Sequence, residues 1–212
     1  MIRILLALVC LNCAVRAGEP AKTASRTLAL IEKTEFDTPE SREHLRKVAK
    51  WADAGLVPAL RNATSIEVYS LDPDKYKYQD LSAELGPPGD GRPQVPKRLP
   101  VPKGTVFFYD YRVLGKVTVE RGARFEKLRE SLITGIAPGS MMLCYSPRHG
   151  IRVKGKTGTI DLVICFQCGR SAVYGLKSDA PPWSFIPPVT KDLLNEILDE
   201  AKIERDLTER KQ

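Results

Sequence analysis

Hydrophobic positions in the first third of the chain follow a helical period and then alternate as in a strand. The apolar residues of the first segment recur three or four residues apart: Leu45, Val48, Ala49 and Ala52. This spacing predicts an amphipathic helix, with Thr38 as its N-cap and Pro39 at its first position. Gly55 is expected to end or kink it. Apolar and polar residues then alternate over 65–71, which predicts a strand.

The second half reads as a series of strands with one helix among them and one at its end. The strands are predicted at Phe107–Val113, Lys116–Val119, Met141–Tyr145, Gly150–Lys154, Thr159–Phe166 and Ser171–Leu176. We expect a turn near Leu114-Gly115, and a central strand buried on both faces at Thr159–Phe166, which is nearly all apolar. An amphipathic helix is predicted over Gly122–Ile136, and Thr190 is expected to cap the final helix.

This order of elements predicts an α+β fold with an antiparallel sheet of about five strands and helices packed on one face. The stretch 72–103 holds seven prolines and no periodicity, and is expected to be an extended surface loop. We expect a helical segment over 18–64, an α+β domain over 65–203 and a charged tail over 204–212.

The N-terminus predicts export. A short basic start at Arg3 precedes an apolar run over 4–15, and Val15-Arg16-Ala17 fits a signal-peptidase site, so residues 1–17 are expected to be a signal peptide. The run is too short for a stable membrane anchor, and no membrane span is expected after cleavage. The expected location is the periplasm, the cell envelope or the medium.

Charge indicates the kind of partner but not its identity. Lys and Arg number 33 against 26 Asp and Glu, a formal net charge of +7. Such an excess favours an anionic surface or polymer and gives no specific signal for nucleic acid. A local basic run is a candidate anion-binding face, the alternative being a solvated sheet face and turn: Arg148, Arg152, Lys154 and Lys156.

The only concentrated chemistry lies around three cysteines and one histidine: Cys144, His149, Cys165 and Cys168. If residues 154–158 close a hairpin, Val153 lies opposite Ile160, and counting outward places Cys144 near Cys168 and Arg148 near Cys165. In an oxidising compartment a disulfide of Cys144 with Cys165 or Cys168 is the leading expectation.

Other readings of this cluster stay open. One alternative is that the thiols are unpaired and buried. A second is that the four residues bind a metal such as zinc, and a third is that the thiols form a redox centre. Against a metal site, two cysteines three residues apart on a straight strand point to opposite faces. Residues 150–157 match the letters of a phosphate-binding loop, but such a loop requires a helix after it, and here we expect strand both within the match and after it, at Thr159–Phe166.

Two segments carry a family resemblance. CYSPRHGIR at 144–152, followed by DLVICFQC at 161–168, resembles an uncharacterised family of exported bacterial proteins with the signature C-F-x-P-R-H-G-I-R leading to D-L-V-I-C-F-x-C. The resemblance covers roughly residues 60–176 without the proline-rich stretch. It implies a shared α+β fold and export, and it implies no activity.

The sequence therefore predicts an exported binding or structural module, leaning towards a non-enzymatic one and stabilised by its cysteine cluster. No catalytic residue and no cofactor-binding motif is identified. The alternative is a metal-binding or thiol-dependent redox protein that uses Cys144, His149, Cys165 and Cys168.

Overall fold

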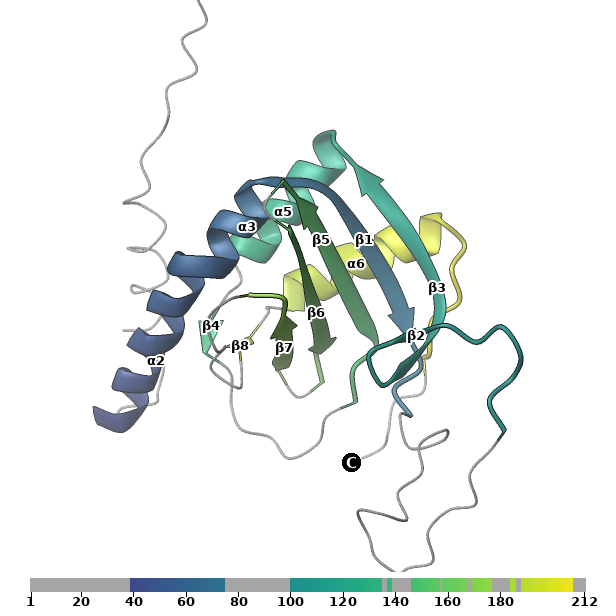
Figure 1. Cartoon of the computed structure of the whole chain (residues 1–212), viewed down its shortest axis with the longest axis horizontal. Coiled ribbons are helices and arrows are strands. Elements are labelled where there is room, and N and C mark those ends of the chain that lie inside the picture. The colour runs from purple at the N-terminus through teal and green to yellow at the C-terminus, as the bar shows by residue number, and fades with distance from the viewer. Residues whose placement is uncertain are drawn as a thin grey trace, which may run out of the picture.

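The computed structural model of the chain describes residues 39–74, 100–134, 137–138, 146–156, 158–167, 169–176, 184–185 and 188–207. The predicted signal peptide, most of the proline-rich stretch and the predicted strand at 141–145 lie outside these residues. Among the described residues the elements follow one another as helices, strands, one helix, further strands and a last helix (Figure 1).

The described strands form one sheet, in the order β2-β3-β1-β5-β6-β7-β8-β4. Five of them are five residues or longer: β1 (Ala63–Leu71), β3 (Tyr111–Glu120), β5 (His149–Gly155), β6 (Gly158–Cys165) and β7 (Arg170–Tyr174). Three contain two residues each: β2 (Phe107–Phe108), β4 (Ala137–Pro138) and β8 (Ser184–Phe185). All neighbouring strands are antiparallel, so the predicted fold class is confirmed.

The helices cover one face of this sheet. They are α2 (Pro39–Trp51), a π-helical segment η1 (Ala52–Leu56), α3 (Val57–Arg61), α5 (Ala123–Thr134) and α6 (Pro188–Glu200). Figure 1 shows α5 and α6 lying behind the strands. Their apolar residues pack with alternate residues of the sheet, among them Ile66, Ile151 and Leu162, to form the main core. The predicted kink at Gly55 corresponds to the π-helical segment.

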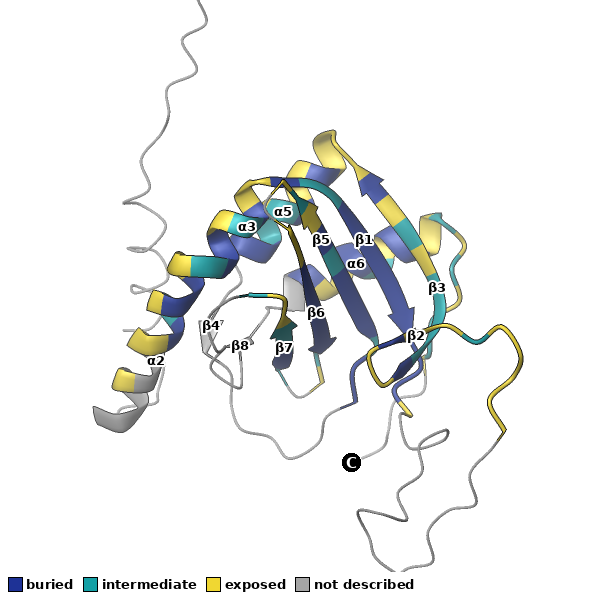
Figure 2. Ribbon diagram, viewed as in Figure 1, coloured by how far each residue is buried: buried dark blue, intermediate teal, exposed yellow. Residues whose placement is uncertain are grey.

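The hairpin of β5 and β6 has the register that the sequence predicts, because Val153 pairs with Ile160 and Gly155 with Gly158. Six consecutive residues that end β6 are buried, which confirms a central strand buried on both faces (Figure 2). The phosphate-binding-loop letters at 150–157 fall mainly on β5 itself.

The predicted turn at Leu114-Gly115 is wrong. β3 runs through both residues, and an irregularity in its pairing with β1 falls between Ser70 and Leu71. The glycine serves packing instead, because a Cβ on Gly115 would lie 2.6 Å from Cγ2 of Ile203. The chain turns earlier, between β2 and β3, at Tyr109 and Asp110.

The predicted cap at Thr190 is also wrong, because α6 begins at Pro188. Proline suits a first helical turn, where its missing N–H needs no partner. Thr190 lies inside the helix and is fully buried. Its hydroxyl is hydrogen-bonded to the Ser131 hydroxyl at 2.7 Å, which joins α6 to α5.

Candidate functional site

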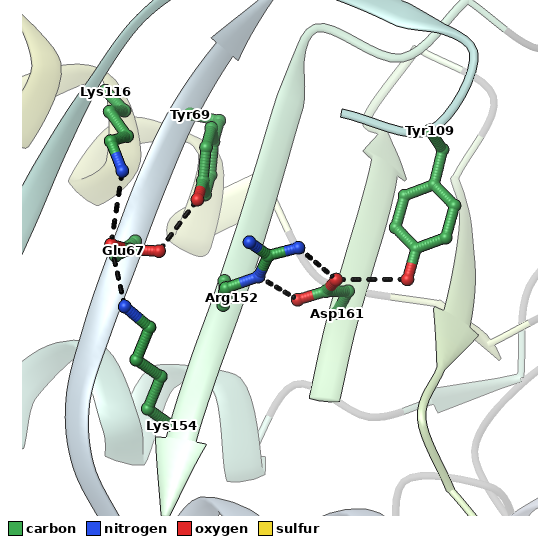
Figure 3. A network of polar contacts seen from close by, with 7 residues as sticks. All are labelled: Glu67, Tyr69, Tyr109, Lys116, Arg152, Lys154 and Asp161. Carbon is green, nitrogen blue, oxygen red and sulfur yellow. Dashed lines mark hydrogen bonds and ion pairs between the residues drawn. The ribbon is translucent and has the colours of Figure 1, made fainter. Parts of the chain in front are cut away.

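The face of the sheet away from the helices carries a network of charged and aromatic side chains (Figure 3). Side chains alternate along a strand, so residues between the core positions of β1, β5 and β6 point to this side, which we call the open face. Two carboxylates form its centre, Glu67 on β1 and Asp161 on β6, and both are buried. A buried carboxylate needs charged or hydrogen-bonding partners, and each of them has several.

Glu67 connects three strands. Its Oε1 accepts hydrogen bonds from Nζ of Lys154 on β5 at 3.0 Å and from Nζ of Lys116 on β3 at 3.3 Å. Its Oε2 accepts one from the Tyr69 hydroxyl at 2.7 Å. Burial raises the pKa of Glu67, but the hydrogen bonds from Tyr69 and the two lysines outweigh this and hold its pKa at about 2. The carboxylate is therefore charged at neutral pH.

Asp161 binds the third cation of the network. Arg152, its cross-strand neighbour, donates from Nε to Oδ1 at 2.9 Å and from a terminal nitrogen to Oδ2 at 2.8 Å. This two-point contact fixes the plane of the guanidinium. The Tyr109 hydroxyl donates to Oδ2 at 3.0 Å. Burial and this hydrogen bond raise the pKa of Tyr109, so its hydroxyl stays protonated.

Aromatic rings adjoin the charged groups. The rings of Tyr69 and Phe108 lie 4.4 Å apart between centroids, and Tyr109 stacks on Tyr174 at 3.9 Å. The Arg152 guanidinium lies 5.3 Å from the centroid of Phe108, within cation–π range. Tyr109 and Tyr174 are 42% and 40% exposed, so a ligand has access to this pair.

On the open face, the Phe108 ring packs directly against Gly150 of β5. A Cβ there would lie 2.8 Å from Cδ1 of Phe108, so only glycine lets the ring lie on β5. Tyr109, the residue after Phe108, has a φ of 55°, a backbone conformation that residues other than glycine rarely adopt. Its contacts with Asp161 and Tyr174 hold it there. Phe108 also packs with Leu71, forming part of a second apolar cluster.

The predicted anion-binding residues lie along the β5–β6 hairpin, and the structure gives three of them carboxylate partners. Arg152 binds Asp161 and Lys154 binds Glu67, as described above. Nε of Arg148 lies 3.8 Å from Oδ2 of Asp206. Lys156 is exposed next to the turn of the hairpin. The structure thus brings Arg152 and Lys154 into one network, together with members that no sequence pattern indicated: Glu67, Tyr69, Tyr109, Lys116 and Asp161.

His149 lies on the opposite side of the sheet. It shares its face with Ile151 and Val153, and its Nε2 is 2.9 Å from Oδ1 of Asn195 on α6. Its Nδ1 is buried and has no hydrogen-bond partner in the described part of the chain. Burial lowers the pKa of His149 to about 4, so the ring is neutral at pH 7.

Cys165, at the end of β6, alternates with Ile164 and therefore shares the face of Val163 and Asp161. It is buried, its sulfur is not a free thiol, and Sγ accepts a hydrogen bond from the backbone N–H of Ser146 at 3.4 Å. The sheet thus separates Cys165 from His149.

Cys144 and Cys168 lie outside the described residues. Within the residues described, no group of three or more His, Cys, Asp or Glu is placed to hold a metal ion. The site predicted from Cys144, His149, Cys165 and Cys168 therefore stays a prediction.

Comparison with protein-family models, curated proteins and solved structures gave no significant match to this chain. A further finding concerns membranes: none of the helices in the described ranges is long and apolar enough to span one.

Proposed function

We propose that this chain is an exported, non-enzymatic binding module that holds an anionic polymer on its open face, at Lys116, Arg152 and Lys154. One observation carries the proposal: two buried carboxylates hold three cations in fixed positions on a surface that the helices leave uncovered. Because these side chains are held in place before any ligand arrives, little conformational entropy is lost on binding.

The exposed fractions of the charged side chains indicate that the ligand is negatively charged. The side chains of Lys116 and Lys154 are 53% and 47% exposed, whereas that of Glu67 is 7% exposed. Each ammonium group has three donors and gives one to Glu67, so further donors of both lysines are available to a ligand. A ligand therefore meets the cations first, and an oxyanion is the group that matches them.

The stacked Tyr109–Tyr174 pair supports a ligand with rings beside its charges. The Tyr109 hydroxyl and the Arg152 guanidinium both bind Asp161, so the pair lies near Arg152. Both rings are partly exposed. Flat aromatic faces bind the apolar side of ring-shaped groups, while the neighbouring cations bind their acidic substituents. A polymer of acidic or sulfated sugar units has both features.

Calorimetric titration with dextran sulfate tests this proposal. The Lys116→Gln/Lys154→Gln variant is expected to bind about tenfold more weakly, or about 1.4 kcal/mol. The matched control is Lys47→Gln/Lys127→Gln, which removes the same charge from side chains 70% and 66% exposed on α2 and α5. Equal weakening in both variants would mean that only net charge matters and would contradict the proposal.

A third variant distinguishes weaker binding from a loss of folding. Removing both lysines leaves the buried Glu67 carboxylate without cations, which destabilises the fold. Glu67→Gln/Lys116→Gln/Lys154→Gln removes that charge as well and is expected to fold while still binding dextran sulfate weakly. Binding by this variant at the strength of the unmodified chain would refute the role of the lysines.

Export and a disulfide belong to the same proposal. We expect the mature protein to begin at Gly18 and Cys165 to be bonded to Cys144 or Cys168. Three observations support this: the apolar run over 4–15, the burial of Cys165, and its lack of a free thiol. Mass spectrometry of the protein from the producing cell, with and without reduction, measures both the N-terminus and the pairing.

The alternative function is the metal- or thiol-dependent one predicted at Cys144, His149, Cys165 and Cys168, although His149 and Cys165 lie on opposite faces of the sheet. The free Nδ1 of His149 favours it, because a ligand histidine has one ring nitrogen free and the other held by a neighbour such as Asn195. One stoichiometric zinc ion in the purified protein, together with absence of a disulfide, would support this alternative against the leading proposal.

A further inference from the structure

Among the described residues, only a short part of the outer edge of β3 is paired. β2 pairs with β3 only at Tyr111 and Arg112, and the backbone N–H of Val113 donates to the carbonyl of Val106 at 2.8 Å. From Leu114 to Glu120 no strand within the described residues pairs with this side of β3. An unpaired strand edge presents backbone donors and acceptors to any extended chain that approaches.

The pairing with β1 shows which of these groups point outward. The N–H of Asp72 donates to the carbonyl of Arg112, so the backbone groups of Asp72 point towards β3. Because these groups alternate along a strand, those of Ser70, Val68 and Ile66 point towards β3 as well. Their partners therefore turn their backbone groups inward: Gly115, Val117 and Val119. The residues between them turn their N–H and C=O groups outward: Lys116, Thr118 and Glu120.

Two grooves follow this same edge. One, of about 390 Å³, has Lys103, Arg112 and Lys116 in its lining and no carboxylate among its lining residues. The other, of about 350 Å³, lies between β3 and α6. Val117, Val119 and Ile197 supply apolar surface to it, and Arg124 and Glu200 are also in its lining.

A strand added at this edge would use both grooves. Its side chains would alternate between the open face, beside Lys116 and Thr118, and the helix face, beside Val117 and Val119. Residues on the first side meet a cation, and residues on the second side meet the apolar groove against α6.

We infer that the free edge of β3 binds an extended peptide by strand addition, with an acidic residue beside Lys116 and apolar residues beside Val117 and Val119. Backbone hydrogen bonds to Lys116, Thr118 and Glu120 supply affinity, and the two grooves supply specificity. This site is distinct from the anion-binding face, although Lys116 contributes to both.

Selection of seven-residue peptides from a displayed library on the whole chain, followed by fluorescence anisotropy with the selected peptides, tests the inference. Enriched peptides are expected to alternate apolar and polar residues with an acidic residue on the polar side. Thr118→Pro removes one outward N–H and is expected to weaken their binding by about tenfold or more. Thr118→Ala keeps the N–H and is expected to bind normally.

Two further results separate strand addition from a damaged fold or a loss of charge. Thr118→Pro is expected to keep its far-ultraviolet circular dichroism and its binding to dextran sulfate. Lys116→Glu is expected to lose the acidic peptides and to regain binding when their acidic residue is replaced by lysine. A selection that enriches no peptide, peptides that bind Thr118→Pro as well as the original chain, or failure of the charge swap would overturn the inference.

Discussion

Gly150 lies where the Phe108 ring comes closest to the sheet, so this position has no room for a side chain. Gly150→Ala would place a Cβ 2.8 Å from Cδ1 of Phe108 and force the ring away from β5. We expect a loss of about 1–3 kcal/mol in the free energy of unfolding, as for other overpacked sites. Urea denaturation followed by circular dichroism measures this loss.

Gly55 provides the matched control. A Cβ there would lie 3.4 Å from Cδ1 of Leu176, an ordinary contact, and Gly55 is in a helical segment where alanine is preferred. Gly55→Ala is therefore expected to be neutral or slightly stabilising. Equal destabilisation by the two substitutions would contradict the role assigned to Gly150.

The lowered pKa of Glu67 predicts how the stability of the fold depends on pH. Its pKa is lowered to about 2, so its contribution to stability is fully present above the pKa of about 4.5 of an ordinary glutamate. The contribution is lost as the pH falls from there towards 2. Glu67→Gln is expected to cost about 1–3 kcal/mol at pH 7, because its partners lose a charged acceptor.

The pH series for Glu67→Gln consists of urea titrations at several values between pH 7 and pH 2.5. The difference in free energy of unfolding between the two proteins should shrink over the acidic half of this series. Glu43→Gln, at an exposed glutamate with partners only on its own helix, is expected to change stability by less than about 0.5 kcal/mol throughout. A constant difference for Glu67→Gln would show that its charge does not stabilise the fold.

At the scale of elements, His149 and Asn195 join β5 to α6. The pKa of His149 is lowered to about 4, so the link is intact above the pKa of about 6.5 of an ordinary histidine. Its contribution to stability is lost as the pH falls from 6.5 towards 4. Protonation would place an unpaired charge in the core beside α6.

Carbon-13 NMR of the histidine rings tests the state of His149. Its titration midpoint is expected near pH 4, and His149→Gln is expected to remove part of the loss of stability between pH 6.5 and pH 4. A midpoint near 6.5 would mean that the ring is open to solvent and does not join the two elements.

Hydrophobic patterning predicted most elements, because the positions that alternate or recur along the chain are those that pack in the main core. It failed where one residue serves a distant contact. Gly115 signals a turn by composition, but the structure needs it against Ile203. The real turn uses Tyr109, whose positive φ depends on Asp161 and Tyr174, and no local signal in the sequence indicates this.

The candidate site was harder to predict for a similar reason. The cysteines and His149 are close in sequence and therefore stand out as a cluster, whereas the residues of the network come from β1, β3, β5, β6 and the turn before β3. Glu67 and Asp161 stand at polar positions of strands, which usually face solvent. Their burial depends on the turn after β2 and on Lys116, which only the folded chain places beside them.

At the scale of the molecule, the two faces of the sheet differ in kind. The helices cover one face and form the main core there, while the other carries cations anchored on buried carboxylates, with aromatic rings beside them. If the open face binds an anionic polymer as proposed, the excess positive charge of the whole chain would favour its approach, and the anchored cations would decide where it binds.

Salt dependence follows from this arrangement. Binding of dextran sulfate releases counterions, so its affinity is expected to fall steadily as sodium chloride rises from about 50 to 200 mM. Lys116→Gln/Lys154→Gln should show a shallower dependence than Lys47→Gln/Lys127→Gln. Calorimetry at four salt concentrations measures both slopes, and equal slopes would argue against the open face as the site.

NMR chemical-shift mapping with dextran sulfate, by nitrogen-15 for the backbone amides and by carbon-13 for the side chains, locates the binding face of the protein. The account predicts that the amides and side-chain signals of Lys116, Arg152 and Lys154, with the ring signals of Tyr109 and Tyr174, shift most, and that residues of α5 and α6 stay in place. Largest shifts on the helices, or shifts spread evenly over all lysines, would contradict it.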